Sequence, residues 1–97
     1  MILEIADITI RPGDEVAFDA AIARGINDIV SRSPGFRAAR VHKGIESPQR
    51  YVLQIEWDTI ENHTVDFRQS AAFTAWRAIV GPFFAQAPRV EHFERVC

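Results

Sequence analysis

The chain has one cysteine and no long hydrophobic run. These two absences bear on the cellular compartment and on membrane insertion. Its 97 residues include one cysteine, Cys97, so no disulfide can form within the chain, and we expect a reducing, cytoplasmic compartment. No stretch approaches the roughly 18 uninterrupted apolar residues of a spanning helix, so we expect no membrane partner. The opening MILEIADITI carries Glu4 and Asp7 and no basic residue, which is unlike a secretory signal peptide.

Basic patches and metal-binding patterns are also scarce. The net charge is -2, and no basic stripe is interleaved with aromatic residues, so we expect no nucleic-acid partner. Arg37, Arg40, Lys43 and Arg50 fit the solvated faces of a hairpin better than an anion site. The three histidines lack short ligand spacing, and the chain has no phosphate-binding loop, dinucleotide fingerprint or nucleophile elbow. We therefore expect no metal and no cofactor.

The composition that remains is that of one ordinary globular domain. Apolar residues make up 47% of the chain and charged residues 25%. The length is enough for one domain and not for two, which predicts a single domain over residues 1–97. A domain of this size buries only about 60–70% of its unfolded surface, so a partner chain can help to complete its core.

Alternating and β-branched segments predict four strands, over residues 2–10, 36–43, 50–57 and 89–96. Two helical regions lie between them. The first follows the cap residue Asp14 and has apolar residues at helical spacing, Phe18, Ile22, Ile26 and Ile29. Gly25 lies on that face, where it would permit close approach to the sheet. The second region begins at Asp58, with Glu61 at capping-box spacing, and Ser70 caps a further helical stretch.

This order, β-α-β-β-α-β, predicts a ferredoxin-like α+β fold. The four strands would form one antiparallel sheet with both helices on one face. The other face would be uncovered in a monomer, although the strand over residues 50–57 carries apolar side chains on both faces. An uncovered sheet invites a second sheet, so we predict a homodimer with two-fold symmetry.

One histidine interrupts an apolar helical stripe in WDTIENHTVDFRQSAAFTAWR, residues 57–77. The stripe follows helical spacing through Ile60, Thr64, Phe67 and Ala71, and His63 points along it. His63 can be a buried histidine that binds a backbone carbonyl, a general base or hydrogen-bond donor in a cleft, or a metal ligand. An apolar cleft would disfavour the imidazolium and keep the ring able to accept a proton.

Most aromatic residues lie in the second half of the chain, near His63 and Arg77. Each ring can simply fill the core, but together they predict a flat apolar pocket with a few polar groups, the usual composition of a small-molecule site. The residues we expect to contact a substrate are Phe67, Trp76, Phe83, Trp57 and His92. Arg77 either faces solvent or holds a phenolate or carboxylate.

The motif H-T-x-x-F-R-x-S-x-x-F-x-x-W-R, from His63 to Arg77, resembles the antibiotic biosynthesis monooxygenase family of dimeric α+β barrel proteins. P-F-F at 82–84 and V-E-H-F at 90–93 extend the resemblance. It implies a homodimeric barrel that oxygenates phenols, quinols or anthrone-like polyketides without metal or flavin. It also implies that His63 is a base or donor, that Arg77 steadies an oxyanion, and that Phe67, Trp76 and Phe83 enclose the substrate rings. Haem degradation is disfavoured, because that branch has tryptophan where this chain has Phe67 and histidine where it has Arg77.

Three function classes compete at this point. The first is a cofactor-independent monooxygenase that oxidises an electron-rich aromatic compound with O2. The second is a non-catalytic dimer that binds a hydrophobic small molecule, for example in stress. The third is an isomerase or lyase, which would also need one base in an apolar pocket.

Overall fold

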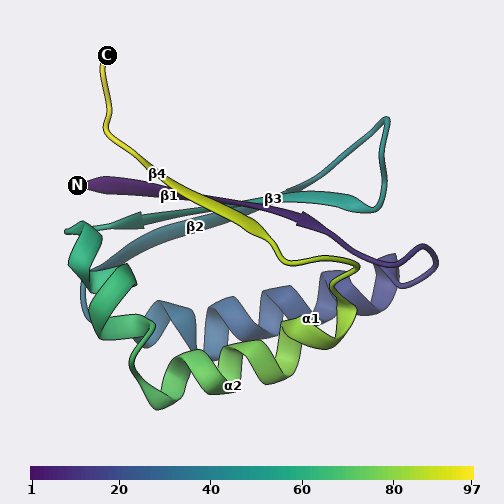
Figure 1. Ribbon diagram of the computed structural model, residues 1–97, viewed down its shortest axis with the longest axis horizontal. Coiled ribbons are helices and arrows are strands. Elements are labelled where there is room, and N and C mark those ends of the chain that lie inside the picture. The colour runs from purple at the N-terminus through teal and green to yellow at the C-terminus, as the bar shows by residue number, and fades with distance from the viewer.

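The computed structural model describes residues 1–97 as a four-stranded antiparallel sheet with two helices on one face (Figure 1). The strands are β1 (Ile2–Thr9), β2 (Phe36–Lys43), β3 (Arg50–Trp57) and β4 (Arg89–Phe93). The helices are α1 (Glu15–Asp28) and α2 (Ala71–Val80). A π-helical segment (Asn62–Phe67) precedes α2, and 3-10 turns follow α1 at Val30–Arg32 and α2 at Gly81–Phe83. The strand order is β2-β3-β1-β4, so the predicted ferredoxin-like fold is confirmed.

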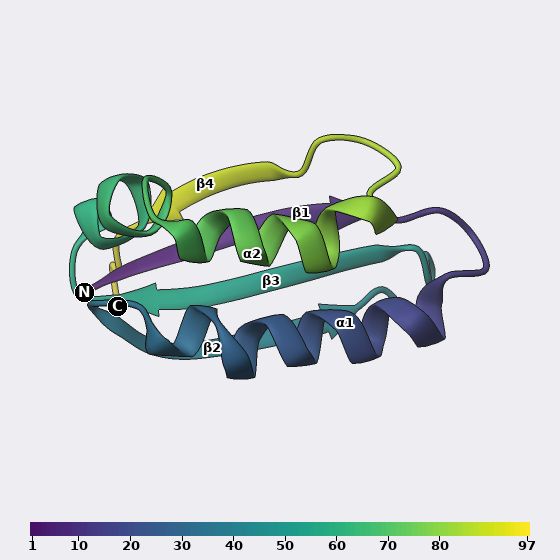
Figure 2. The ribbon, with the colours of Figure 1, turned by 90° about the horizontal axis from the view of Figure 1, so that it is seen from below.

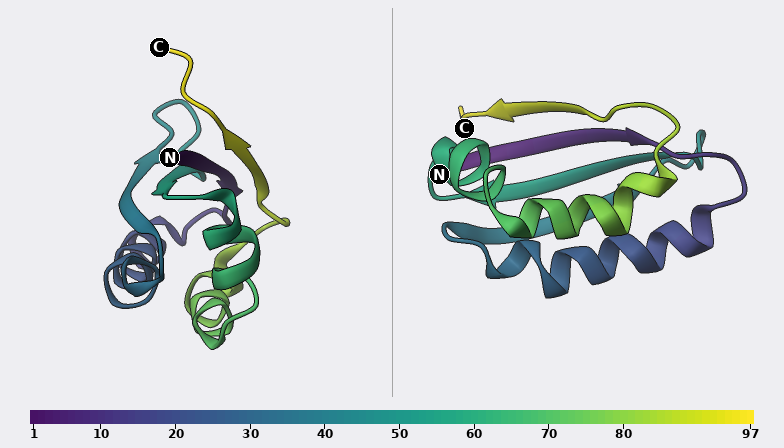
Figure 3. Two further views of the ribbon diagram at one scale, coloured as in Figure 1. Left: turned by 90° about the vertical axis from the view of Figure 1, so that its left-hand side faces the viewer. Right: turned by 60° about the horizontal axis from the view of Figure 1, so that its bottom comes forward.

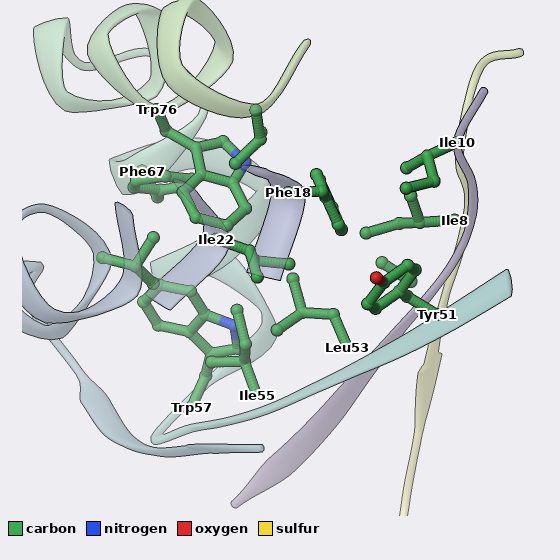
Figure 4. Close-up of a cluster of buried hydrophobic side chains, with 13 residues drawn as sticks. Ile8, Ile10, Phe18, Ile22, Tyr51, Leu53, Ile55, Trp57, Phe67 and Trp76 are labelled. Carbon is green, nitrogen blue, oxygen red and sulfur yellow. The ribbon is translucent and has the colours of Figure 1, made fainter. Parts of the chain in front are cut away.

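The core lies between the sheet and the helices. Figure 2 shows α1 and α2 side by side across the sheet, and the end view in Figure 3 shows that both lie on the same side. Alternate residues of β3 turn toward them, and all four of these are buried: Tyr51, Leu53, Ile55 and Trp57. The apolar cluster in Figure 4 also contains Ile8, within β1, and Ile10, just after its end. Phe18 and Ile22 of α1 pack against them from the helix side.

Gly25 allows the two helices, rather than helix and sheet, to approach each other. A Cβ atom at this position would lie 2.8 Å from Cε3 of Trp76 in α2, closer than real Cβ contacts. The sequence predicted that Gly25 permits close approach to the sheet, but the close contact is with α2. The contact matters for the site, because it fixes where the Trp76 ring lies over the sheet.

The chain between β3 and α2 departs most from the sequence prediction. The helical turn is capped by Thr59 and not by Asp58, since the Thr59 backbone N–H donates to Oδ1 of Asn62 and the Asn62 N–H donates to Oγ1 of Thr59. Asp58 instead forms an ion pair with Arg37. The following residues form a π-helix, with the Arg68 N–H bonded to the His63 carbonyl.

The π-helix changes which side chains point inward. His63 and Phe67 are buried, whereas Ile60 and Ala71, which belong to the same predicted stripe, are exposed. The stripe fails there because its spacing assumes an unbroken α-helix. Ser70 does cap α2, as predicted, by accepting a hydrogen bond from the Phe73 N–H.

The far face of the sheet is uncovered. It carries Leu3, Ile5, Val52 and Phe93, among polar residues such as Asp7 and Arg50. β4 ends at Phe93, three residues before the predicted end of the last strand, and Val96 beyond it is exposed. No helix in this structure has the length and apolar character needed to span a bilayer.

Candidate active site

A cavity of about 250 Å³ lies between α2 and strands β1, β3 and β4. Its walls are mostly apolar, with aromatic rings on the helix side: Phe67, Phe73, Trp76 and Phe84. Four polar side chains also line it: Glu4, His63, Arg68 and Arg77. Arg68 and Arg77 are exposed, whereas Glu4 and His63 are only 4% exposed, so the cations lie at the rim and the acid–imidazole pair lies deep.

The predicted site residues fall into two groups. His63, Phe67, Trp76 and Arg77 all line the cavity. Three others do not, for reasons that differ.

Phe83 packs against Phe18 with ring centroids 5.5 Å apart, and its neighbour Phe84 lines the cavity in its place. Trp57 is fully buried behind the cavity wall, where it supports the acid. His92 lies on the outer side of His63. Figure 4 shows Phe67 and Trp76 on the helix side and Trp57 rising from the sheet.

Glu4 is the centre of the polar end of the cavity. Its β1 position faces the helices in phase with Ala6 and Ile8, so the strand buries a carboxyl group. The Trp57 indole N–H donates to Oε1 of Glu4 at 2.9 Å, and Nε2 of His63 lies 3.3 Å from the same oxygen. The Trp57 ring also stacks on His63, with centroids 5.6 Å apart. Trp57 therefore holds both members of the pair in place.

The second ring nitrogen of His63 is also engaged. Nδ1 of His63 lies 2.7 Å from Nε2 of His92, which lies directly opposite Glu4 in the β1–β4 pairing. The three groups form a chain, because His63 uses opposite sides of its ring toward Glu4 and His92. Both ring nitrogens therefore face side chains and not a backbone carbonyl, which was one of the three interpretations left open by the sequence. No three His, Cys, Asp or Glu side chains converge in a way that could hold a metal ion.

Burial controls protonation at this end of the cavity. Desolvation raises the pKa of Glu4 to about 7, against smaller lowering effects from the Trp57 hydrogen bond and Arg68. Desolvation, with smaller contributions from Arg68 and His92, lowers the pKa of His63 to about 4. His92 also has a lowered pKa, mainly through burial. Near pH 7 both imidazoles are therefore neutral, and Glu4 is divided between its acid and its carboxylate.

The two arginines occupy different ends of the rim. Arg68 follows the π-helix directly and is close enough to influence the pKa values of Glu4, His63 and His92. Arg77 lies over the rings of Phe73 and Phe84, with its Cζ 5.9 and 6.0 Å from their centroids. Neither arginine forms a salt bridge within the chain, so both are available to an anionic group of a guest.

Glu4 and Arg68 were not among the predicted site residues. A signal for Glu4 is its position in phase with the isoleucines of the first strand, which puts a carboxylate on a buried face. Arg68 gives no comparable signal, because an exposed arginine beside a helical stripe is ordinary and only the fold shows that it lines the cavity.

Comparison with known proteins agrees with this architecture. The sequence model of the antibiotic biosynthesis monooxygenase family matches residues 1–79. The uncharacterised Bacillus subtilis protein YczJ is 35% identical over 96 residues, which cover 99% of this chain and 100% of YczJ.

Solved structures extend the comparison. A Bordetella bronchiseptica protein named for the same family is 45% identical and superposes with a TM-score of 0.93, covering 99% of this chain and 97% of that one. A Nitrosomonas europaea protein, also named for this family, has a TM-score of 0.82 over 100% of both chains, and at 18% identity it supports the fold alone. Sequence and structure together lead to one conclusion: the chain belongs to the antibiotic biosynthesis monooxygenase family.

Proposed function

We propose that this protein is a cofactor-independent monooxygenase that oxidises an electron-rich aromatic compound, such as a phenol or quinol, with O2. The observation that carries the proposal is a ring-lined cavity that ends at a buried acid–imidazole pair, Glu4 and His63. Family membership supports it, because the family is named for this class of reaction.

The size and lining of the cavity favour a flat apolar guest. A buried apolar cavity of about 150 Å³ is enough for benzene. At about 250 Å³, this one has room for a compound of one or two rings. Phe67 and Trp76 supply planar surfaces for stacking, while Arg68 and Arg77 can attract an anionic substituent at the rim.

The proposed oxidation requires the protein to remove one proton from the substrate in a site that excludes water. The Glu4–His63 pair takes the phenolic proton, and the resulting electron-rich anion can reduce O2 by one electron. The two radicals join to give a ring-carbon peroxide. The O–O bond then breaks as the C–H proton leaves, so one oxygen atom stays in the quinone and the other departs as water. Burial supports proton removal, because it brings the pKa of Glu4 to about 7, where a general base works best at neutral pH.

The experiment is oxygen uptake by chelator-treated protein supplied with a naphthol, a quinol or an anthrone, with ¹⁸O2 to follow the oxygen atom. We expect uptake and one labelled oxygen in the product. Glu4→Gln and His63→Ala should lose this activity, and Glu61→Gln, an exposed acid outside the cavity, should keep it. Tight binding without uptake would replace the proposal with a carrier role, and conversion without oxygen would replace it with an isomerase or lyase.

We also propose that two copies pair through the uncovered sheet face. The supporting observation is the apolar set Leu3, Ile5, Val52 and Phe93, with Phe93 43% exposed in the single chain. Sedimentation equilibrium should give a dimer, and Val52→Asp should give a monomer. A monomeric wild-type protein at micromolar concentration would contradict the proposal.

A further inference from the structure

The chain of hydrogen bonds does not stop at the cavity. His92 is excluded from the cavity lining and is only half-buried on the edge strand β4, yet its ring is bonded to His63 at 2.7 Å. Glu4 and His63 both line the cavity, whereas His92 lies outside it on the edge strand β4. The base at the bottom of the cavity therefore has a second connection to solvent besides the cavity mouth.

We propose that Glu4, His63 and His92 form a proton relay, with Glu4 as the proton acceptor inside the cavity and His92 as the group that exchanges protons with solvent. In its catalytic role the relay rests on the monooxygenase proposed above. As a physical property of the protein it does not, since it can be measured without any substrate. His92, which lies outside the cavity, would then be a proton-transfer and positioning residue, whereas Glu4 and His63 both line the cavity that holds the substrate.

The relay has two arrangements in which both histidine rings are neutral, and they differ in the tautomer of each ring. When Glu4 is ionised, its Oε1 accepts from Trp57 and lies 3.3 Å from Nε2 of His63, which carries the ring proton on that side, so Nδ1 of His63 accepts from Nε2–H of His92. When Glu4 is protonated, its O–H donates to Nε2 of His63, and Nδ1–H of His63 donates to Nε2 of His92. Nδ1 of His92 then carries a proton.

The two arrangements differ by one proton, and three short transfers connect them. The Glu4 proton moves to Nε2 of His63, the Nδ1 proton of His63 moves to Nε2 of His92, and the Nδ1 proton of His92 leaves to solvent. When the three protons move in concert, neither ring becomes an imidazolium. That agrees with the burial of both rings, which lowers their pKa values and disfavours the cation.

The surroundings contain few other charges that would disturb this exchange. The π-helix and β4 supply His63 and His92 themselves, β1 supplies Glu4, and β3 supplies the uncharged indole of Trp57. Arg68 is the cation that faces all three titrating groups, and it favours the ionised form of Glu4. A bound aromatic guest would block the mouth, and the relay would still return Glu4 to its ionised form.

The substrate-free test is ¹⁵N NMR of the histidine rings between pH 5 and pH 9. We expect His63 and His92 to switch tautomer together, with one midpoint near that of Glu4, and to lose this switch in Glu4→Gln. His42, exposed on the other face of the sheet, serves as an internal reference in the same spectra. A single tautomer of either ring over the whole range, or a switch that survives in Glu4→Gln, would overturn the relay.

The kinetic test distinguishes a proton-transfer role of His92 from a purely structural role. Gln at position 92 can still donate a hydrogen bond to Nδ1 of His63 but cannot pass a proton on. With an aromatic compound that supports oxygen uptake, His92→Gln should lower kcat at least tenfold with little change in KM, and imidazole should restore turnover in His92→Ala. Unchanged kcat in His92→Gln would contradict the catalytic role. If no compound supports uptake, the monooxygenase proposal fails while the NMR result still decides the relay.

Discussion

Glu4 and Asp7 lie three residues apart on the same strand, but they face opposite sides of the sheet and their carboxyl groups behave in opposite ways. Glu4 faces the helices and has no cation in direct contact, so burial raises its pKa to about 7. Asp7 faces the uncovered side, where hydrogen bonds from Arg50 at 2.7 and 3.0 Å lower its pKa. The direction in which each side chain leaves the strand thus keeps Glu4 able to exchange a proton near neutral pH and places Asp7 beside Arg50, where it is ionised at neutral pH.

The strongest test of this contrast removes the buried carboxyl group. Glu4→Gln keeps an oxygen that can accept from Trp57 but cannot take a proton. We expect oxygen uptake to fall by about 10²–10⁴-fold, the usual contribution of a general base. Glu61→Gln, matched in chemistry and exposed, should stay within about twofold of wild type, well below that effect. Equal activities of Glu4→Gln and wild type would remove Glu4 from the mechanism.

The two carboxyl groups should also affect stability with opposite dependence on pH. The folded pKa of Glu4 lies above its unfolded value of 4.5, so the stability that it contributes is complete below pH 4.5 and is lost as pH rises through about 7. Glu4→Gln should therefore gain about 3 kcal/mol over wild type between pH 4 and pH 8. Urea unfolding at both pH values measures the difference.

The matched variant at the exposed position should behave in the reverse sense. The pKa of Asp7 is lowered, so its contribution is present at neutral pH and is lost as pH falls through the folded value. Asp7→Asn should cost less than about 1 kcal/mol at pH 7, because the pair is solvent-exposed, and nothing at strongly acid pH. The contrast between the faces would be wrong if both variants followed the same trend with pH.

The covered face should also be the more sensitive one to added volume. Gly25→Ala pushes a methyl group against Trp76, and we expect a net loss of about 1–2 kcal/mol, since overpacking outweighs the gain in helix propensity. Gly81→Ala is the control, because its Cβ would meet only Nε of Arg77 at 3.5 Å. Thermal unfolding of both variants provides the measurement. Equal melting temperatures would mean that the helices move apart freely.

The smallest expected effect concerns the charge of Arg68, which opposes the effect of burial on the pKa of Glu4. Arg68 lowers the pKa of Glu4, so Arg68→Met should raise it further, by less than about one unit for a cation in contact with solvent. Arg24→Met, on the exposed side of α1, should leave it unchanged. NMR titration of the Glu4 carboxyl carbon follows both. A fall in this pKa on loss of Arg68 would mean that Arg68 does not stabilise the Glu4 carboxylate.

The fold was predictable because its information is local. The residue pattern of 50–57 identified the strand β3 with its bounds, and the order of strands and helices identified the topology. The predicted start of the second helical region was wrong because a local preference competed with a contact distant in sequence. Asp58 has the chemistry of a cap, but it is drawn into an ion pair with Arg37 on another strand, and the cap falls to Thr59.

The site was only partly predictable because its contacts are distant in sequence. His63 stood out as a titratable ring on an apolar stripe, but Glu4 is far from it along the chain and is joined to it only by the folded sheet. Phe83 and Phe84 differ by one position, and a single 3-10 turn decides which ring lines the cavity. Periodicity cannot resolve a choice of that kind.

The pairing of β1 with β4 has a consequence for how the protein matures. Glu4 belongs to the first strand and His92 to the last, so their alignment is among the contacts with the largest sequence separation in the molecule. Contacts of this kind form late, because a long loop must close first. A nascent or partly folded chain would therefore carry the aromatic residues without the Glu4–His63–His92 arrangement, which would form only when synthesis and sheet closure are complete.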